Sequence, residues 1–356
     1  MLPVRQVLLP ISSTSDIPLR IAIVGCGSVV ERFHLPASML IPELSIEFLV
    51  DRERSRAATL AATYRVPNVA TDFREIIGKV DAAIIALPHN LNAEASRGLL
   101  NAGVSVLVEK PMAFNAAEGK QLLTAAKHSK VLFNVGYTRR FSYGVQFIRR
   151  ALRENLLGRI TKFSVEDGYP FDWKSAGSEF RLDKTGGGGV LLDLGCHVLD
   201  MVIFWFGAVT VHSALHDSLG GVEINAVAHL ETPLGLRGTV ELSWERLLRN
   251  SAIIEGTAGR LEVEWYNNSA TAYLSGSMLR GTVAPEGSKQ LVQTFDMMFV
   301  EQLREWVRVL RGKSEGDVLA TGRDAALVLE LVEACRSQGK IWQPPWSSTE
   351  REKLLQ

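Results

Sequence analysis

Short apolar runs alternate with helix-like segments from about residue 19 to residue 135. The runs are rich in Val and Ile and are apolar on both faces, which is typical of buried parallel strands. They cover residues 21–24, 46–50, 82–87, 104–108 and 131–135, and the helix-like segments cover residues 30–40, 53–64, 73–78, 91–102 and 116–128. Asn115, with Glu118 three residues later, is predicted to cap the last of these helices. The alternation predicts an α/β domain built on a doubly wound parallel sheet.

The pattern changes after about residue 140. Segments with period-two alternation are separated by short turns, which predicts an antiparallel sheet with one open face. The expected strands are residues 160–167, 223–231, 236–244, 252–255 and 261–265; the expected helices are 141–155, 190–206, 295–311 and 320–337, with a loop at 275–290. The second half is therefore expected to be an α+β domain with a large, mainly antiparallel sheet. We expect an extension at 1–18, domains at 19–138 and 139–340, and a tail at 341–356.

Charge and cysteine content narrow the class of protein. Lys+Arg and Asp+Glu are both 39, so there is no basic excess of the kind that nucleic-acid binding requires. No uncharged apolar stretch is long enough to span a membrane, and no basic cluster indicates a membrane surface. Cys26, Cys196 and Cys335 form no disulfide framework and no metal-type spacing, which favours a cytoplasmic protein without a metal site.

A glycine pair follows the first predicted strand. Gly25 permits a tight turn, and Gly27 lets the backbone approach a pyrophosphate, which the helix N–H groups from Ser28 and Val29 onward would receive. Val30 stands where the dinucleotide fingerprint has its third glycine, and an ordinary glycine-rich turn has the same pattern. The strand–turn–helix context favours a Rossmann-type dinucleotide site in the first domain.

An acid at the end of the second predicted strand supports this site. Asp51 is placed to accept from a ribose 2′-OH and would repel a 2′-phosphate, so NAD is favoured, while NADP stays possible because Arg52 is adjacent. Leu87 and Pro88 follow the next central strand and are predicted to line the path of the cofactor.

Two further places carry candidate chemistry. Lys110 follows the strand at 104–108, where it would face the crevice beside the nicotinamide, although a surface lysine at a strand end has the same pattern. A glycine run at 186–189 precedes Asp193, His197 and Asp200, which share one face of a helix at i, i+4 and i+7. The rest of that helix is apolar, so this stripe needs partners or a ligand; an internally satisfied core pair and a metal site are the alternatives.

Taken together, these motifs resemble the glucose–fructose oxidoreductase/inositol dehydrogenase (Gfo/Idh/MocA) family over about residues 20–340. The matching residues are Gly25-Cys26-Gly27 with His34, Asp51, Glu109-Lys110-Pro111, the segment 136–141, and the glycine run leading to Asp193, His197 and Asp200. The resemblance implies that Lys110, Asp193 and His197 are catalytic, that Glu109 belongs to the cofactor site, and that the substrate is a secondary hydroxyl of a sugar, sugar derivative or cyclitol. Two residues depart from the family pattern: Val30, and Asn92, where the family often has His.

For this reaction we expect His197 to be the general acid/base, Lys110 to stabilise the alkoxide, and Asp193 to orient a hydroxyl or the imidazole; the roles of Lys110 and His197 can be exchanged. Tyr137, Arg139, Tyr169, Trp173 and Arg181 are predicted to line the substrate side. Two alternative functions are NAD-assisted elimination or glycoside cleavage and a non-catalytic dinucleotide-sensing regulator. The open sheet face suggests a homodimer or homotetramer.

Overall fold

A computed structural model describes residues 17–170, 188–218, 222–266, 268–274, 276–284 and 293–344. Within these residues the chain forms two compact units. The first unit extends to Thr138 and also includes Phe295–Ala325; the second extends from Arg139 to Thr294 and from Ala326 onward.

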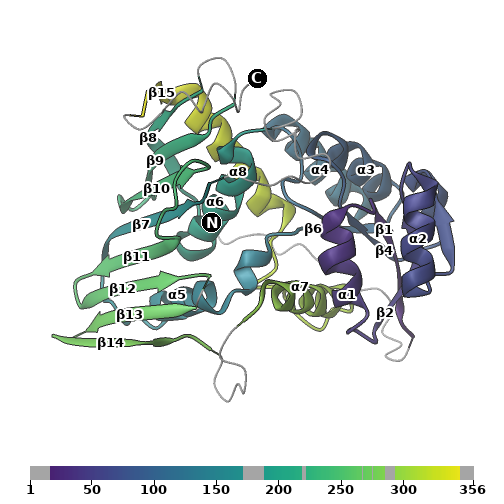
Figure 1. Ribbon diagram of the computed structural model, residues 1–356, viewed down its shortest axis with the longest axis horizontal. Coiled ribbons are helices and arrows are strands. Elements are labelled where there is room, and N and C mark those ends of the chain that lie inside the picture. The colour runs from purple at the N-terminus through teal and green to yellow at the C-terminus, as the bar shows by residue number, and fades with distance from the viewer. Residues whose placement is uncertain are drawn as a thin grey trace. The chain divides into compact units, whose positions relative to one another are not determined.

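The first unit is built on a six-stranded parallel sheet with the order β3-β2-β1-β4-β5-β6 (Figure 1). Its strands are β1 (Leu19–Val24), β2 (Leu44–Val50), β3 (Asn68–Ala70), β4 (Ala82–Ile85), β5 (Ser105–Val108) and β6 (Phe133–Val135). This strand order is that of the dinucleotide-binding fold, whose ligands lie beyond the carboxyl ends of the strands beside β1. The predicted doubly wound parallel sheet is confirmed.

Helices connect these strands. They are the π-helical turn Val30–His34 with α1 (Leu35–Ser38), α2 (Arg54–Tyr64), the 3-10 turn Phe73–Ile76, α3 (His89–Asn101) and α4 (Ala116–Ser129). The predicted cap of α4 is present, because the side chain of Asn115 accepts a hydrogen bond from the backbone N–H of Glu118 at 2.9 Å. The helix predicted at residues 30–40 starts earlier, at Ser28, and contains a π-helical turn at Val30–His34 before α1.

A later segment of the chain returns to the first unit. The Phe299 ring of α7 (Phe295–Leu310) stacks on Phe33, with centroids 4.9 Å apart, and the backbone N–H of Val135 donates to the carbonyl of Ala320 at 3.0 Å. The expected domain at 139–340 therefore differs from the observed units, in which Phe295–Ala325 belong to the first. The aromatic contact joins residues far apart in the sequence, so no local pattern reveals it.

The second unit contains a nine-stranded, mainly antiparallel sheet with the order β14-β13-β12-β11-β7-β10-β9-β8-β15. Its strands are β7 (Ile160–Gly168), β8 (Thr210–His216), β9 (Asn225–Glu231), β10 (Arg237–Ser243), β11 (Ser251–Gly256), β12 (Gly259–Glu264), β13 (Ser269–Leu274), β14 (Ser277–Thr282) and β15 (Lys340–Ile341). The prediction of a loop at 275–290 is wrong for Ser277–Thr282, which form β14. Every side chain of β14 is exposed, so the strand has no alternation and is defined by its pairing with β13.

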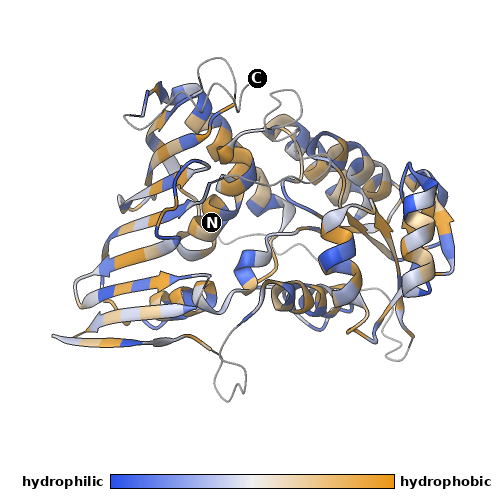
Figure 2. Cartoon of the chain, in the orientation of Figure 1, coloured by the Kyte–Doolittle hydropathy of each residue, from blue (hydrophilic) through white to orange (hydrophobic). Residues whose placement is uncertain are grey.

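Helices cover one face of this sheet. They include α5 (Tyr143–Arg153), α6 (Val190–Phe206) and the greater part of α8 (Gly322–Gln338). Helix α6 is largely orange in Figure 2, which matches its burial along almost its whole length. Leu242 of β10 lies so close to Gly195 that a Cβ there would be 2.7 Å from the leucine Cδ1, so α6 packs tightly on the centre of the sheet.

No helix in the described part of the chain is long and apolar enough to cross a membrane. Among the same residues, no group of three or more His, Cys, Asp and Glu side chains could hold a metal ion.

Candidate active site

The turn after β1 has the geometry of a phosphate-binding loop. Gly25 has φ +96°, and a Cβ there would lie 2.2 Å from the carbonyl oxygen of Ala86, so only glycine fits. At Gly27 the space is open, since an added Cβ would meet nothing within 4 Å. A helical segment begins at Ser28 and continues through Val29, so its first N–H groups have no carbonyl acceptor within the helix. This geometry suits a dinucleotide pyrophosphate, and the binding of that group by Gly25, Gly27, Ser28 and Val29 stays a prediction.

Asp51 is bonded to this loop. Its carboxylate is buried and accepts from the N–H of Cys26 and the N–H of Glu53, both at 2.9 Å. Each carboxylate oxygen has a further lone pair, so Asp51 can still accept from a ribose hydroxyl. Arg52 is exposed beside it. Asp51 therefore holds the glycine loop in addition to the role expected for it.

The side chain of Asn92 connects the loops after β4 and β5. It is fully buried, and its Oδ1 accepts from the N–H of Leu87 at 3.1 Å. Its Nδ2 donates to the carbonyls of Glu109, at 3.3 Å, and Pro111, at 3.1 Å. The two carbonyls flank Lys110, which is partly exposed. The residue that departs from the family pattern thus fixes the backbone on both sides of the candidate catalytic lysine.

Glu109 is turned toward the interior of the first unit. Its Oε1 lies 2.7 Å from Nε2 of the buried His34, and its Oε2 accepts from the N–H of Lys110 at 3.3 Å. A Cβ at Gly136 would be 3.0 Å from Oε1, so this glycine makes room for the carboxylate. Glu109 therefore supports the backbone at Lys110, while its carboxylate is engaged by His34.

The three polar residues predicted on one face of α6, Asp193, His197 and Asp200, have different surroundings. Asp200 is 1% exposed and forms a bidentate pair with the buried Arg140, at 2.8 Å and 2.6 Å. Asp193 is also buried, whereas His197 is half-buried and is the least buried residue between Val190 and Trp205. The internally satisfied pair is thus Asp200 with Arg140, and His197 is the group on this stretch that can meet a ligand.

The residues predicted to line the substrate side differ in burial and in their contacts. Arg139 forms an ion pair with the fully buried Asp167, and burial raises the pKa of the Asp167 carboxyl although the guanidinium opposes that shift. Tyr137 is buried, and Tyr169 directly follows β7. Trp173 and Arg181 lie outside the described residues. The positive charge of Arg139 is therefore balanced within the second unit.

Two family models match the amino-acid sequence. One is described as "Oxidoreductase family, NAD-binding Rossmann fold" and covers residues 19–137; the other is the "GFO/IDH/MocA C-terminal domain" and covers residues 145–262. The chain belongs to the Gfo/Idh/MocA oxidoreductase family. Its membership confirms the predicted family, the oxidoreductase class and the NAD-binding Rossmann domain.

Two relatives illustrate the similarity of this chain to known enzymes. Trans-1,2-dihydrobenzene-1,2-diol dehydrogenase of Mus musculus is 27% identical over 69% of this chain and 74% of its own length. D-glucoside 3-dehydrogenase of Escherichia coli is 29% identical over 57% of this chain and 58% of its own length. Both are dehydrogenases, in agreement with the predicted enzyme class.

Solved structures share the Gfo/Idh/MocA fold. Levoglucosan dehydrogenase in complex with NADH and L-sorbose aligns with a TM-score of 0.80 at 20% identity, over 90% of this chain and 97% of that one. A 3-ketoreductase from Actinomadura kijaniata, in complex with NADP and TDP-benzene, aligns with a TM-score of 0.77 at 20% identity, over 92% of this chain and 100% of that one. At these identities the likeness concerns the fold.

The contacts of Asn92 lead to a prediction for this Gfo/Idh/MocA chain. Asn92→Asp keeps the shape and the acceptor for Leu87 but removes both donors, and it directs a carboxylate at the carbonyls of Glu109 and Pro111. Leaving buried acceptors unsatisfied costs about 1–3 kcal/mol each, so we expect a clearly lowered melting temperature together with a fall in kcat. Thermal unfolding and steady-state kinetics measure both.

Asn90→Asp is the matched control, since Asn90 is exposed on the same helix. Wild-type stability and kcat in Asn92→Asp would show that the three hydrogen bonds do not hold the lysine loop.

Proposed function

We propose that this chain is a dehydrogenase that uses NAD, with NADP as the less favoured cofactor, to oxidise or reduce a secondary alcohol or ketone of a sugar, sugar derivative or cyclitol. Relatives and structural neighbours include enzymes of sugar chemistry, among them D-glucoside 3-dehydrogenase and levoglucosan dehydrogenase. The observation that carries the proposal is on α6: His197 is half-buried, whereas the other residues from Val190 to Trp205, Asp193 among them, are buried.

The residues of the chain handle the proton and the orientation of the substrate. A bound nicotinamide would supply the acceptor or donor of the hydride at the carbinol carbon. His197 accepts the hydroxyl proton during oxidation and returns it during reduction, Lys110 stabilises the alkoxide, and Asp193 orients a hydroxyl or the imidazole. In the alternative assignment Lys110 transfers the proton and His197 stabilises the oxygen.

The pairing of Arg139 with Asp167 favours a neutral substrate. Arg139 is paired with Asp167, so its guanidinium does not provide an uncompensated charge for a carboxylate or phosphate. Asp51 favours NAD, because its buried carboxylate would lie against a 2′-phosphate.

A substrate screen tests the proposal. The purified protein is incubated with NAD or NADP and a panel of neutral sugars, methyl glycosides and cyclitols, and the near-ultraviolet absorbance of reduced nicotinamide is followed. We expect turnover with NAD on at least one neutral polyol. Turnover of a glycoside by tightly held NAD without net cofactor reduction would favour elimination, and dinucleotide binding without any turnover would favour a regulator.

We also propose a cytoplasmic homodimer or homotetramer that associates through the open face of the large sheet. The three cysteines are free and buried, which suits a reducing compartment. The open face is polar and carries ion pairs such as Arg246 with Glu241 and Arg260 with Glu262, so we expect a salt-sensitive interface. A monomeric mass in light scattering at low ionic strength would contradict this assembly.

A further inference from the structure

Helix α6 begins without a capping side chain of its own. The preceding residue, Gly189, has φ +103° and offers no side chain to the first turn. The N–H groups of a helix start need partners when they are buried. Glu223, which precedes β9, supplies them: its carbonyl accepts from Val190 N–H at 2.8 Å, and its Oε1 accepts from Leu191 N–H at 3.2 Å. A carboxylate from a distant segment thus caps α6, where the helix dipole favours negative charge.

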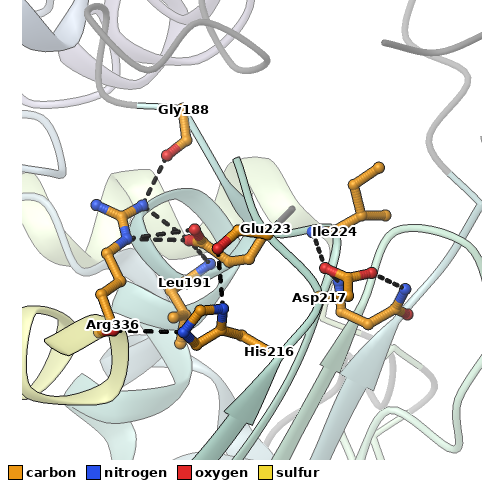
Figure 3. A network of polar contacts seen from close by, with 9 residues as sticks. Gly188, Leu191, His216, Asp217, Glu223, Ile224 and Arg336 are labelled. Carbon is orange, nitrogen blue, oxygen red and sulfur yellow. Dashed lines mark hydrogen bonds and ion pairs between the residues drawn. The ribbon is translucent and has the colours of Figure 1, made fainter. Parts of the chain in front are cut away.

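Arg336 of α8 holds this cap in place (Figure 3). Its Nη2 donates to Glu223 Oε1 at 2.7 Å and to the carbonyl of Gly188 at 2.8 Å, and its Nε lies 3.3 Å from both carboxylate oxygens. The carboxylate is 3% exposed, so water can hardly replace the arginine. One guanidinium therefore binds both the cap and the chain that enters the helix.

The same arrangement explains the glycine at the helix entry. A Cβ on Gly189 would lie 2.3 Å from Oε1 of Glu223 and 2.9 Å from Nη2 of Arg336. The ion pair fills the space beside this residue, so the left-handed backbone and the close approach both require glycine. Gly189, the last residue of the glycine run that precedes Asp193 and His197, is therefore required for the observed start of α6.

We infer that Glu223 and Arg336 are positioning residues for Asp193 and His197, an inference that rests on the proposed function. Asp193 is in the first turn of α6, and His197 follows it by one turn. Fixing the first N–H groups fixes both the rotation of the helix and its position along its axis. On the other side of His197, the pair Asp200–Arg140 fixes the next turn. The imidazole is therefore carried on a segment anchored by an ion pair at each end.

Substitutions that keep the shape of the cap test this role. Glu223→Gln retains an acceptor for Leu191 but loses the charge that binds Arg336, and Arg336→Met removes the guanidinium. A displacement of about 1 Å in a catalytic group can cost about 10²-fold in rate, so we expect each variant to lose about tenfold or more in kcat, with a smaller change in the KM for the dinucleotide. The pH profile of kcat should shift as well, because the surroundings of His197 change. The double variant should be no worse than the single ones, and Arg336→Lys should recover part of the loss.

The matched control is Asp81→Asn. Asp81 likewise accepts from a backbone N–H, that of Arg20 at 2.9 Å, and pairs with the guanidinium of the same residue at 2.7 Å. It precedes β4 at the amino end of that strand, so its loss should lower the melting temperature while kcat stays within about twofold of wild type.

Hydrogen exchange gives a readout that needs no turnover. We expect the amides of residues 190–197 to exchange faster in Glu223→Gln and Arg336→Met and to be unchanged in Asp81→Asn. Faster exchange with wild-type kcat and an unchanged pH profile would overturn the positioning role and leave a structural one, and unchanged exchange would overturn the capping itself. Failure of the proposed function is distinct from both, since it appears as absent turnover in the wild type.

Discussion

Replacing Lys110 or His197 by alanine is expected to lower kcat by about 10²–10⁴-fold, the range that a positioned general acid or base contributes. Lys110 and His197 are both partly exposed, whereas the Glu109 carboxylate lies 2.7 Å from His34 and Asp193 is buried. The loss should appear in kcat, since both groups act on charge that develops during the reaction. Steady-state kinetics on the substrate identified by the screen measure this loss, and a dinucleotide titration checks that the cofactor site is intact.

Lys127→Ala and His128→Ala are the controls, because both side chains are exposed on α4. They should retain wild-type kcat. Near wild-type turnover in both Lys110→Ala and His197→Ala would remove the proposed chemistry altogether.

Added bases can separate the two assignments of proton transfer. If His197 is the general acid/base, imidazole in the buffer should restore part of the activity of His197→Ala. If Lys110 has that role, a small primary amine should instead restore Lys110→Ala. The outcome assigns the proton-transfer residue, which spacing along the chain leaves open.

The parts of the fold that could be predicted are those whose signal is local. The strands β1, β4 and β5 are buried on both faces and therefore appear as continuous apolar runs, and the cap of α4 depends on Asn115 and Glu118, three residues apart. The three-residue β3 and the fully exposed β14 carry no such signal, because strand pairing alone defines them. The return of α7 to the first unit depends on an aromatic contact between segments that are distant in sequence.

In the candidate site, too, some residues could be predicted from local sequence patterns and others could not. The residues proposed for chemistry could be found because the motif places them at strand ends and on one helix face. Their supports could not: Arg336 reaches Glu223 across 113 residues, and Asn92 reaches Pro111 across 19. In the sequence, Asn92 was visible only as a departure from the family pattern, and nothing singled out Glu223. Long-range hydrogen bonds of this kind are known only when the fold brings their segments together.

Replacing Gly25 or Gly27 by alanine should have different effects: the first substitution should lower stability, and the second should weaken NAD binding. In Gly25→Ala the new Cβ would lie 2.2 Å from the backbone oxygen of Ala86, at a φ of +96° that alanine rarely adopts. The backbone strain alone costs about 1–3 kcal/mol, and the contact with a rigid carbonyl adds to it. We expect a large fall in the melting temperature of the protein without dinucleotide, and therefore also a loss of activity.

Gly27→Ala should leave that unfolding transition within about 0.5 kcal/mol of wild type, since its Cβ would meet nothing within 4 Å. The methyl group would instead occupy the open space over the helix start, where the pyrophosphate is expected, so the Kd for NAD should rise by about tenfold or more. Thermal unfolding with and without NAD measures both effects, because a ligand at 100 times its Kd stabilises the native state by about 2.7 kcal/mol and this gain shrinks as Kd rises. Wild-type NAD affinity in Gly27→Ala would mean that the dinucleotide does not pass over this loop, because the added methyl group would lie in the space where the pyrophosphate is expected.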